Sequence, residues 1–299
     1  CNIKARVAFQ ILSEDMEPSY WQKLAEMVAD ELNNGAQGVV IPHGTDTMGY
    51  TAAALSFMLK DLSGPVVLVG AQRSSDRPSS DAVQNLTDAV NVASNSDIGE
   101  IVVAMHANMS DKKTYIHRGN KVRKFHTSRR DAFKTVNDRP LGTIEKGEIE
   151  MTEDYKRKTE GETKIDKKLE TDIGIVYSYP GLQPEDIPEK KGLLLIGTGL
   201  GHIPHKTIDR IKQLTEKKDM VFAMASQCFF GRVNMNVYSN GRDLIRAGVI
   251  PCEDMIPETA YVKLMWSLSQ GRNRDEVEKL MKKNISGEIT KRSENSLFF

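Results

Sequence analysis

Thr45, Asp46 and Thr47 follow a short apolar run, 38–42, and precede a stretch rich in small residues. In α/β proteins, a strand that leads through a glycine-containing turn into a helix is a frequent ligand site. The first backbone N–H groups of the helix have no partners, and they can hold an anion or a developing oxyanion. Thr and Asp are also common helix caps, so capping alone is the simpler interpretation.

A threonine hydroxyl is a poor nucleophile until a neighbouring group takes its proton, and an uncharged lysine can do so. Asp46 could orient such a lysine. The chain has 41 Lys and Arg residues, so chemistry alone does not select the partner. The basic segment 116–133, which includes His117 and His126, offers candidates. A solvated loop is the alternative for this segment, and a contact with phosphate or RNA is another.

Polar loops follow three predicted strands at 7–11, 38–42 and 65–70. These loops contain Ser13, Thr45 and the segment 70–86. The carboxyl ends of parallel strands lie at one edge of a sheet, so the three loops are expected to converge there. The convergence predicts a single site.

Two further motifs give weaker indications. Gly197, Gly199 and Gly201 lie in a turn between a predicted strand and helix, but His202 occupies the last glycine position of the dinucleotide pattern GxGxxG. Nucleotide binding is therefore weakly indicated. His202 and His205 are three residues apart without a nearby Cys or Glu cluster, so no metal site is expected.

The alternation of β-branched runs and amphipathic stretches predicts an α/β protein with mostly parallel sheets. The charged segment 152–171 contains few large apolar residues and is predicted to be a linker. It separates an N-terminal lobe, 1–151, from a C-terminal lobe, 172–299. The remaining predicted strands are 100–105, 173–177, 192–196 and 220–225, with a hairpin at 146–147; the predicted helices are 18–33, 47–60, 81–94, 205–215, 260–269 and one that begins near 273.

The composition is that of an ordinary globular chain. The 41 acidic residues balance the 41 basic ones, so no net positive field favours nucleic acid. The three cysteines are widely separated, which favours a reducing compartment. No apolar run is long enough to span a membrane and no leader is recognised, so a cytoplasmic location is expected.

Four motifs occur in order along the chain: "ILSEDM" at 11–16, "HGTDTM" at 43–48, "GAQR" at 70–73 and "KFHTS" at 124–128. Together they resemble the L-asparaginase family, two-lobed amidohydrolases with a threonine nucleophile. The resemblance extends from Ile11 to about Leu268 and implies two lobes, each with a mostly parallel sheet flanked by helices. Within the family, the segment 227–266 is most similar to the ammonia-releasing subunits of archaeal tRNA-dependent amidotransferases.

The resemblance also implies a role for individual residues. Thr45 becomes a catalytic hydroxyl, Asp46 its companion and Lys124 the basic member, with Lys121 as the second choice. The substrate-binding residues implied are Ser13 and Glu14, which would hold the α-carboxylate and α-amino groups of the amide donor, and Gly44 and Ala71, whose backbone would line the pocket. The implied chemistry is acyl transfer, in which a hydroxyl attacks the amide and ammonia leaves.

The partners implied are glutamine or asparagine as donor and a second subunit that binds tRNA. ATP and Mg are expected on that subunit, and no cofactor is expected in this chain. A homodimer within a heterotetramer is implied, in which loops after Gly197 and near Gln227 close the neighbour's site. A free-standing L-asparaginase and a non-catalytic, amino-acid-sensing α/β module are the alternatives.

One part of the family pattern is missing from the sequence. The first catalytic threonine of the family lies in a Thr-Gly-Gly-Thr turn upstream of the "ILSEDM" motif, and this tetrapeptide does not occur in the 299 residues. Since the chain also begins at Cys1, it is expected to be a fragment that lacks the first strand, the nucleophile loop and a further N-terminal domain. We predict that these 299 residues alone release no ammonia from glutamine. Substantial turnover by the isolated chain would contradict both the fragment interpretation and the role of the missing threonine.

Overall fold

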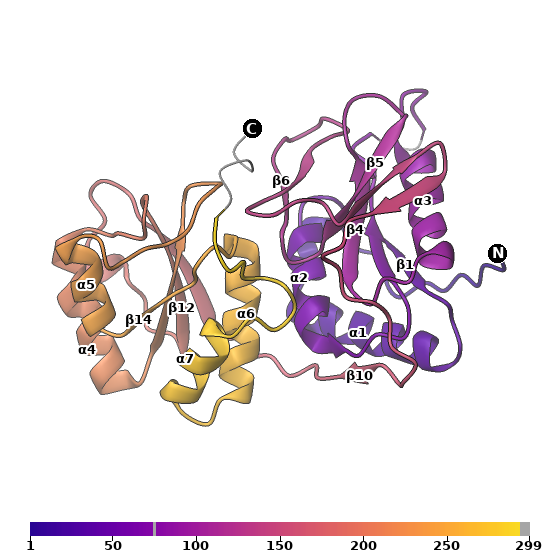
Figure 1. Ribbon diagram of the computed structural model, residues 1–299. Coiled ribbons are helices and arrows are strands. Elements are labelled where there is room, and N and C mark those ends of the chain that lie inside the picture. The colour runs from indigo at the N-terminus through magenta and orange to yellow at the C-terminus, as the bar shows by residue number, and fades with distance from the viewer. Residues whose placement is uncertain (74–75, 294–299) are drawn as a thin grey trace. The chain divides into compact units, whose positions relative to one another are not determined.

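The computed structural model describes residues 1–73 and 76–293 (Figure 1). Residues 74–75 of the "GAQR" loop and the end of the polar tail, 294–299, lie outside the described residues. The chain divides into two compact units, Cys1–Lys167 and Lys168–Phe299. Most of the segment predicted as a linker is therefore counted with the first unit. Within it, β10 (Lys164–Ile165) pairs with β2 (Leu59–Lys60).

The first unit contains a six-stranded sheet in the order β1-β3-β4-β5-β8-β9. The pairs β1–β3 and β3–β4 are parallel, and the three remaining pairs are antiparallel. The strands of this sheet are β1 (Val39–Pro42), β3 (Val66–Val69), β4 (Ile101–His106), β5 (Lys113–Arg118), β8 (Gly142–Glu145) and β9 (Glu148–Met151). A separate antiparallel pair consists of β6 (Val122–Lys124) and β7 (Phe133–Thr135). The predicted hairpin is confirmed, because Lys146 and Gly147 both adopt positive φ in the two-residue turn between β8 and β9.

Three helices cover the parallel part of this sheet (Figure 1). They are α1 (Pro18–Asn33), α2 (Met48–Met58) and α3 (Ala82–Asn95), and a single 3-10 turn, η1, spans Ser13–Asp15. The apolar stripe of α1 is buried, with Pro18 at its first turn. Ten of the eleven residues of α2 are buried, which explains why its sequence is small and apolar all round. The side chains of α3 form a core with β3 and β4.

The strand predicted at 7–11 is wrong. Residues 1–12 form no helix or strand, and Val7 is 85% exposed. β-Branched residues favour a strand only where a neighbouring strand supplies hydrogen bonds and packing, and residues 1–12 pair with no strand of the described chain. Ser13 therefore reaches its position without a preceding strand.

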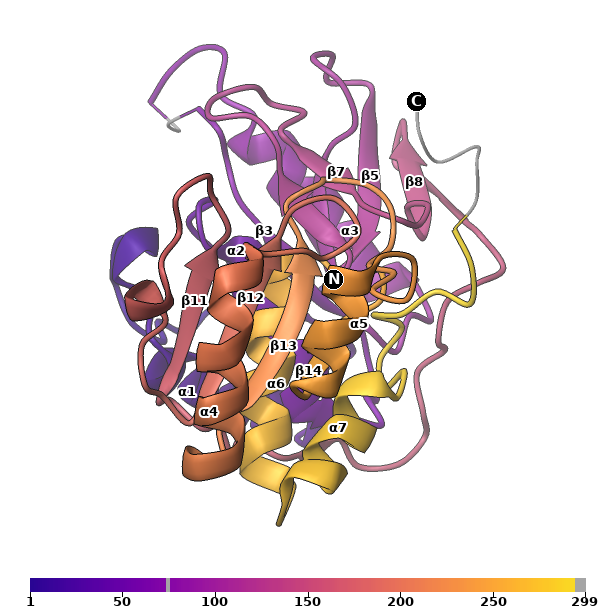
Figure 2. The ribbon, with the colours of Figure 1, turned by 90° about the vertical axis from the view of Figure 1, so that its left-hand side faces the viewer.

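The second unit is a four-stranded parallel sheet in the order β11-β12-β13-β14. Figure 2 shows α4 and α5 in front of these strands and α6 behind them. The strands are β11 (Ile173–Tyr177), β12 (Gly192–Gly197), β13 (Val221–Ser226) and β14 (Val249–Pro251); the helices are α4 (Ile208–Lys218), α5 (Ser239–Arg246), α6 (Pro257–Gln270) and α7 (Arg274–Lys282), with 3-10 turns η2 (Pro184–Asp186) and η3 (His205–Thr207). A core cluster joins α4 and α5 to β12 and β13. The predicted fold class is confirmed.

The basic segment 116–133 is not simply a solvated loop, because His117 and Lys121 are fully buried. His117 lies on β5, where Nδ1 is 2.7 Å from Thr135 Oγ1. Nε2 has no hydrogen-bond partner among the described residues. Burial lowers the pKa of His117 to about 3, so the imidazole is neutral in the folded protein over most of the pH range.

We predict a loss of stability in acid that depends on His117. Unfolded histidine titrates near 6.5, so between that value and about 3 the unfolded chain binds a proton that the folded chain does not. The free energy of unfolding should fall by about 2 kcal/mol from pH 7 to pH 5 through this residue. Urea unfolding of the wild type and His117→Gln at both pH values measures it. Equal losses in the two proteins would contradict the prediction.

Candidate active site

The structure brings Lys124 to the adjacent residues Thr45 and Asp46, which lie 79 and 78 residues before it in the sequence. The Lys124 ammonium donates to Thr45 Oγ1 at 2.8 Å and to Asp46 Oδ1 at 2.8 Å. These distances permit direct proton transfer between the hydroxyl and the lysine nitrogen. As the ammonium, Lys124 donates to Thr45; as the neutral amine, it would accept the threonine proton along the same line.

Two elements of the first unit position this cluster. Thr45 and Asp46 lie in the turn between β1 and α2, at the carboxyl end of a parallel strand. Lys124 ends β6, whose antiparallel partner is β7, and its pairing residue Phe133 is fully buried. Because side chains alternate along a strand, Arg123 points to the opposite face from Lys124. The anchored hairpin thus fixes the stem of the lysine.

Asp46 and Lys124 form an ion pair with unequal exposure. The Lys124 side chain is 16% exposed and the Asp46 side chain 66%. The hydrogen bond from Lys124 holds the pKa of Asp46 below its usual range, and burial opposes this effect only in part. Asp46 therefore remains ionised at neutral pH and can orient the lysine that faces Thr45.

Ser13 approaches the same turn from the segment before α1. Its hydroxyl lies 3.2 Å from Asp46 Oδ2 and 3.5 Å from the carboxylate of Glu14, so Asp46 is the better acceptor. Gly44 allows this approach, because a Cβ at that position would lie 2.5 Å from Ser13 Cβ. Glu14 is exposed. The residues predicted to hold the donor's charged groups therefore lie beside the predicted catalytic residues.

The loop after β3 meets this turn as well. A Cβ added at Gly70 would lie 2.7 Å from His43 O and 2.9 Å from Thr45 Cγ2, so the chain that leads into Ala71 packs directly on the turn. Ala71 is half-buried. The expected convergence of the three loops is therefore found, although the loop with Ser13 follows no strand.

Two residues that hold this turn in place, Thr47 and His43, were not predicted from the sequence. Thr47 stands at the N-cap position of α2 but does not cap it; its hydroxyl donates to Ser13 O at 2.7 Å and so ties the Ser13 segment to the turn. His43 lies 2.6 Å from Gly44 O through Nδ1 and 2.9 Å from Thr51 Oγ1 through Nε2. A carbonyl only accepts, so Nδ1 carries the proton. Burial lowers the pKa of His43, which favours this neutral form.

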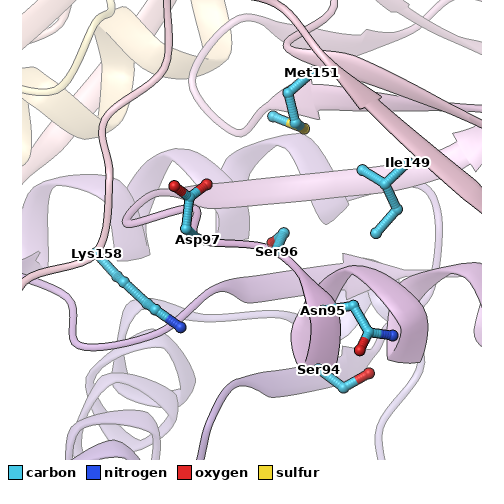
Figure 3. A pocket seen from close by; sticks show the side chains of 7 residues that line it. All are labelled: Ser94, Asn95, Ser96, Asp97, Ile149, Met151 and Lys158. Carbon is cyan, nitrogen blue, oxygen red and sulfur yellow. The ribbon is translucent and has the colours of Figure 1, made fainter.

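A further pocket lies in the first unit. It has a volume of about 500 Å³, lies at the end of α3 and is lined by Ser94, Asn95, Ser96, Asp97, Ile149, Met151 and Lys158. Figure 3 shows these side chains. Asp97 in this pocket is already hydrogen-bonded to Tyr155 and Arg157. Within 1–73 and 76–293, no group of three or more His, Cys, Asp or Glu residues could hold a metal ion. The helices described there are also too short or too polar to cross a membrane.

We predict that Asp46→Asn lowers kcat for amide hydrolysis by about 10- to 100-fold, because the neutral amide weakens a charge-assisted hydrogen bond to Lys124. The measurement is ammonia release by the complete gene product. Asp61→Asn is the matched control, since Asp61 also pairs with a lysine, Lys164, at 2.8 Å but lies outside the cluster. Equal activity of the two variants would contradict the role of Asp46.

Comparison with known proteins identifies the family of the chain. Family models for the N-terminal asparaginase domain and for the glutaminase/asparaginase C-terminal domain match residues 1–157 and 172–281. A glutamyl-tRNA(Gln) amidotransferase subunit from Pyrococcus abyssi is 54% identical over 97% of this chain and 67% of its own length. The corresponding protein from Sulfolobus acidocaldarius is 50% identical over 96% of this chain and 66% of its own length.

Solved structures give the same result. The thermostable L-asparaginase from Thermococcus kodakarensis matches 97% of this chain and 87% of its own, with 31% identity and a TM-score of 0.89. L-asparaginase I from Vibrio cholerae matches 94% of this chain and 84% of its own, with 34% identity and a TM-score of 0.81. Both domains and the fold thus lead to one conclusion: the chain belongs to the asparaginase family.

Proposed function

We propose that this chain supplies Thr45, Asp46 and Lys124 to an amidohydrolase site that releases ammonia from the side-chain amide of glutamine or asparagine, and that the ammonia serves a glutamyl-tRNA(Gln) amidotransferase. The contact of Lys124 Nζ with Thr45 Oγ1, supported by Asp46, is the observation that carries the proposal. The 54% identity to an amidotransferase subunit supports this assignment over a free-standing L-asparaginase, since the matching asparaginase structures are 31% and 34% identical.

In the proposed reaction, the nucleophile is the family's first catalytic threonine, from the Thr-Gly-Gly-Thr turn that these 299 residues do not contain. Its hydroxyl oxygen attacks the amide carbonyl carbon; its proton passes to Thr45 Oγ1 as the Thr45 hydroxyl gives its own proton to the neutral amine of Lys124. Backbone N–H groups of the turn stabilise the oxyanion of the tetrahedral intermediate. Collapse of the intermediate breaks the C–N bond, and the leaving nitrogen takes the proton from Lys124 to become ammonia. Water then hydrolyses the acyl-enzyme ester by the same proton route, and the free amino acid leaves.

Ser13 and Glu14 are assigned to the charged groups of the donor in this proposal. The Glu14 carboxylate suits the α-ammonium group, and the backbone of Gly44 and Ala71 lines the remaining wall. The partner subunit would bind the tRNA and use ATP and Mg, so no cofactor is assigned to this chain. A homodimer within a heterotetramer and a cytoplasmic location complete the proposal.

The experiment that tests this function compares ammonia release from glutamine by the complete gene product in three conditions. They are the protein alone, with its tRNA-binding partner subunit, and with that subunit plus ATP and glutamyl-tRNA(Gln). Stimulation by the full mixture is expected. Rapid release that the partner leaves unchanged would instead favour the free-standing asparaginase, and binding of glutamine without release would favour an amino-acid sensor.

A further inference from the structure

His106 is a fully buried histidine at the end of β4 that the proposed reaction does not use. Its two ring nitrogens face two side-chain oxygens. Nδ1 lies 2.5 Å from Asn85 Oδ1, and Nε2 lies 3.0 Å from Asp111 Oδ1. The protonation state of the ring therefore follows from what these two oxygens can accept or donate.

The orientation of the Asn85 amide is fixed by its other partners. Asn85 Nδ2 donates to Gly70 O at 2.9 Å and to Asp81 Oδ2 at 3.0 Å, and both of these atoms are acceptors. A flipped amide would place its oxygen against both acceptors, which is unfavourable. Asn85 Oδ1 therefore faces the histidine, and His106 Nδ1 must carry a proton.

Asp111 fixes the other nitrogen. Its Oδ1 accepts from Arg130 Nη1 at 2.6 Å as well as facing His106. The hydrogen bond with His106 holds the pKa of Asp111 below its usual range, so this carboxylate is ionised and only accepts. His106 Nε2 must then carry a proton too.

We infer that His106 is held as a doubly protonated imidazolium, and that this buried cation positions the loop that carries Ala71. The inference rests on the proposed function, because it assigns His106 to the pocket through that loop. A buried charge is tolerated only when it is paired and hydrogen-bonded, and here both ring N–H groups have acceptors. Asp81, at the N-cap position of α3, adds to this support because it accepts from Asn85 Nδ2 and so holds the amide with its oxygen toward His106.

The bonds that connect His106 to the loop hold the main chain on both sides of Ala71. Asn85 binds Gly70 O, and the Asp81 carboxylate accepts the N–H groups of Gln72 and Arg73 at 3.0 Å each. Asp81 stands at the N-cap position of α3, but its side chain serves the loop instead of the helix. Arg130 adds a second attachment through Ser79 O at 2.6 Å.

The charge state is tested by NMR of the complete gene product with 15N-labelled histidine rings at pH 7. His106→Gln identifies the signals of His106. We expect both ring nitrogens of His106 to show the chemical shift of a protonated nitrogen. A shift typical of an unprotonated nitrogen at either position would overturn the inference. This readout needs no catalysis, so it remains decisive if the proposed function fails.

The positioning role is tested by the KM for glutamine. His106→Gln should raise KM about tenfold and leave kcat within about twofold, because one charged hydrogen-bonding group is lost from the loop support. His117→Gln is the matched control: it removes a buried histidine from the neighbouring strand, and KM should stay unchanged. If His106→Gln does not fold, Asp111→Asn, at an exposed carboxylate, should raise KM in the same direction. An unchanged KM in the folded variant, or an equal rise in the control, would overturn the positioning role.

Discussion

Lys124→Met should lower kcat for ammonia release by about a thousandfold, because it removes the nitrogen that receives a proton in the transition state. Methionine nearly matches the lysine stem in length, so β6 and its pairing with β7 should be preserved. KM should change by no more than a few fold, since Lys124 is assigned to proton transfer and not to donor binding. Steady-state ammonia release by the complete gene product measures both constants.

Two further variants separate proton transfer from charge alone. Lys124→Arg keeps a positive charge, but a guanidinium does not give up its proton in proteins, so this variant should be as inactive as Lys124→Met. Arg123→Met removes a charge from the same strand on the opposite face and should retain most of the activity. Substantial activity in Lys124→Arg would show that the positive charge, and not proton transfer, is what the reaction needs.

Thr45→Val should cause a loss of similar size, about a thousandfold in kcat, because the isosteric methyl group interrupts the proton route to Lys124. Thr45→Ser keeps a hydroxyl and should recover activity to within about tenfold of the wild type. Thr159→Val is the matched control, since it makes the same substitution at a hydroxyl outside the cluster, one that donates to Asp61 O at 2.8 Å. Activity of Thr45→Val close to that of the control would contradict the role of the hydroxyl.

Much of the fold was predictable from local patterns. The bounds of α1 and β11 agree with the predicted 18–33 and 173–177, because both segments carry their own start and stop signals. The strand at 7–11 was predicted on the same grounds and is wrong, since a strand depends on a neighbour that local sequence does not reveal.

The site was less accessible to sequence reasoning. Thr45 and Asp46 stand out locally, but Lys124 is 79 residues beyond Thr45 and looks like many other lysines; only the family resemblance selected it. The structure shows the contact. The bond from Thr47 to Ser13 O was not predicted, because a threonine just before a helix is usually a cap. The His106 cluster was missed because its members are brought together by β4, α3 and the loops beside them, with no motif in the sequence.

The central claim is that Thr45 and Lys124 act as one unit in amide hydrolysis. The most direct test measures kcat for ammonia release from glutamine by the two single variants, Thr45→Val and Lys124→Met, and by the double variant. The effects of substitutions at residues that act in one step are strongly non-additive, so we expect the double variant to lose activity about a thousandfold, no more than either single variant. A double variant whose loss equals the product of the two single losses would show that the residues act independently and would contradict the account.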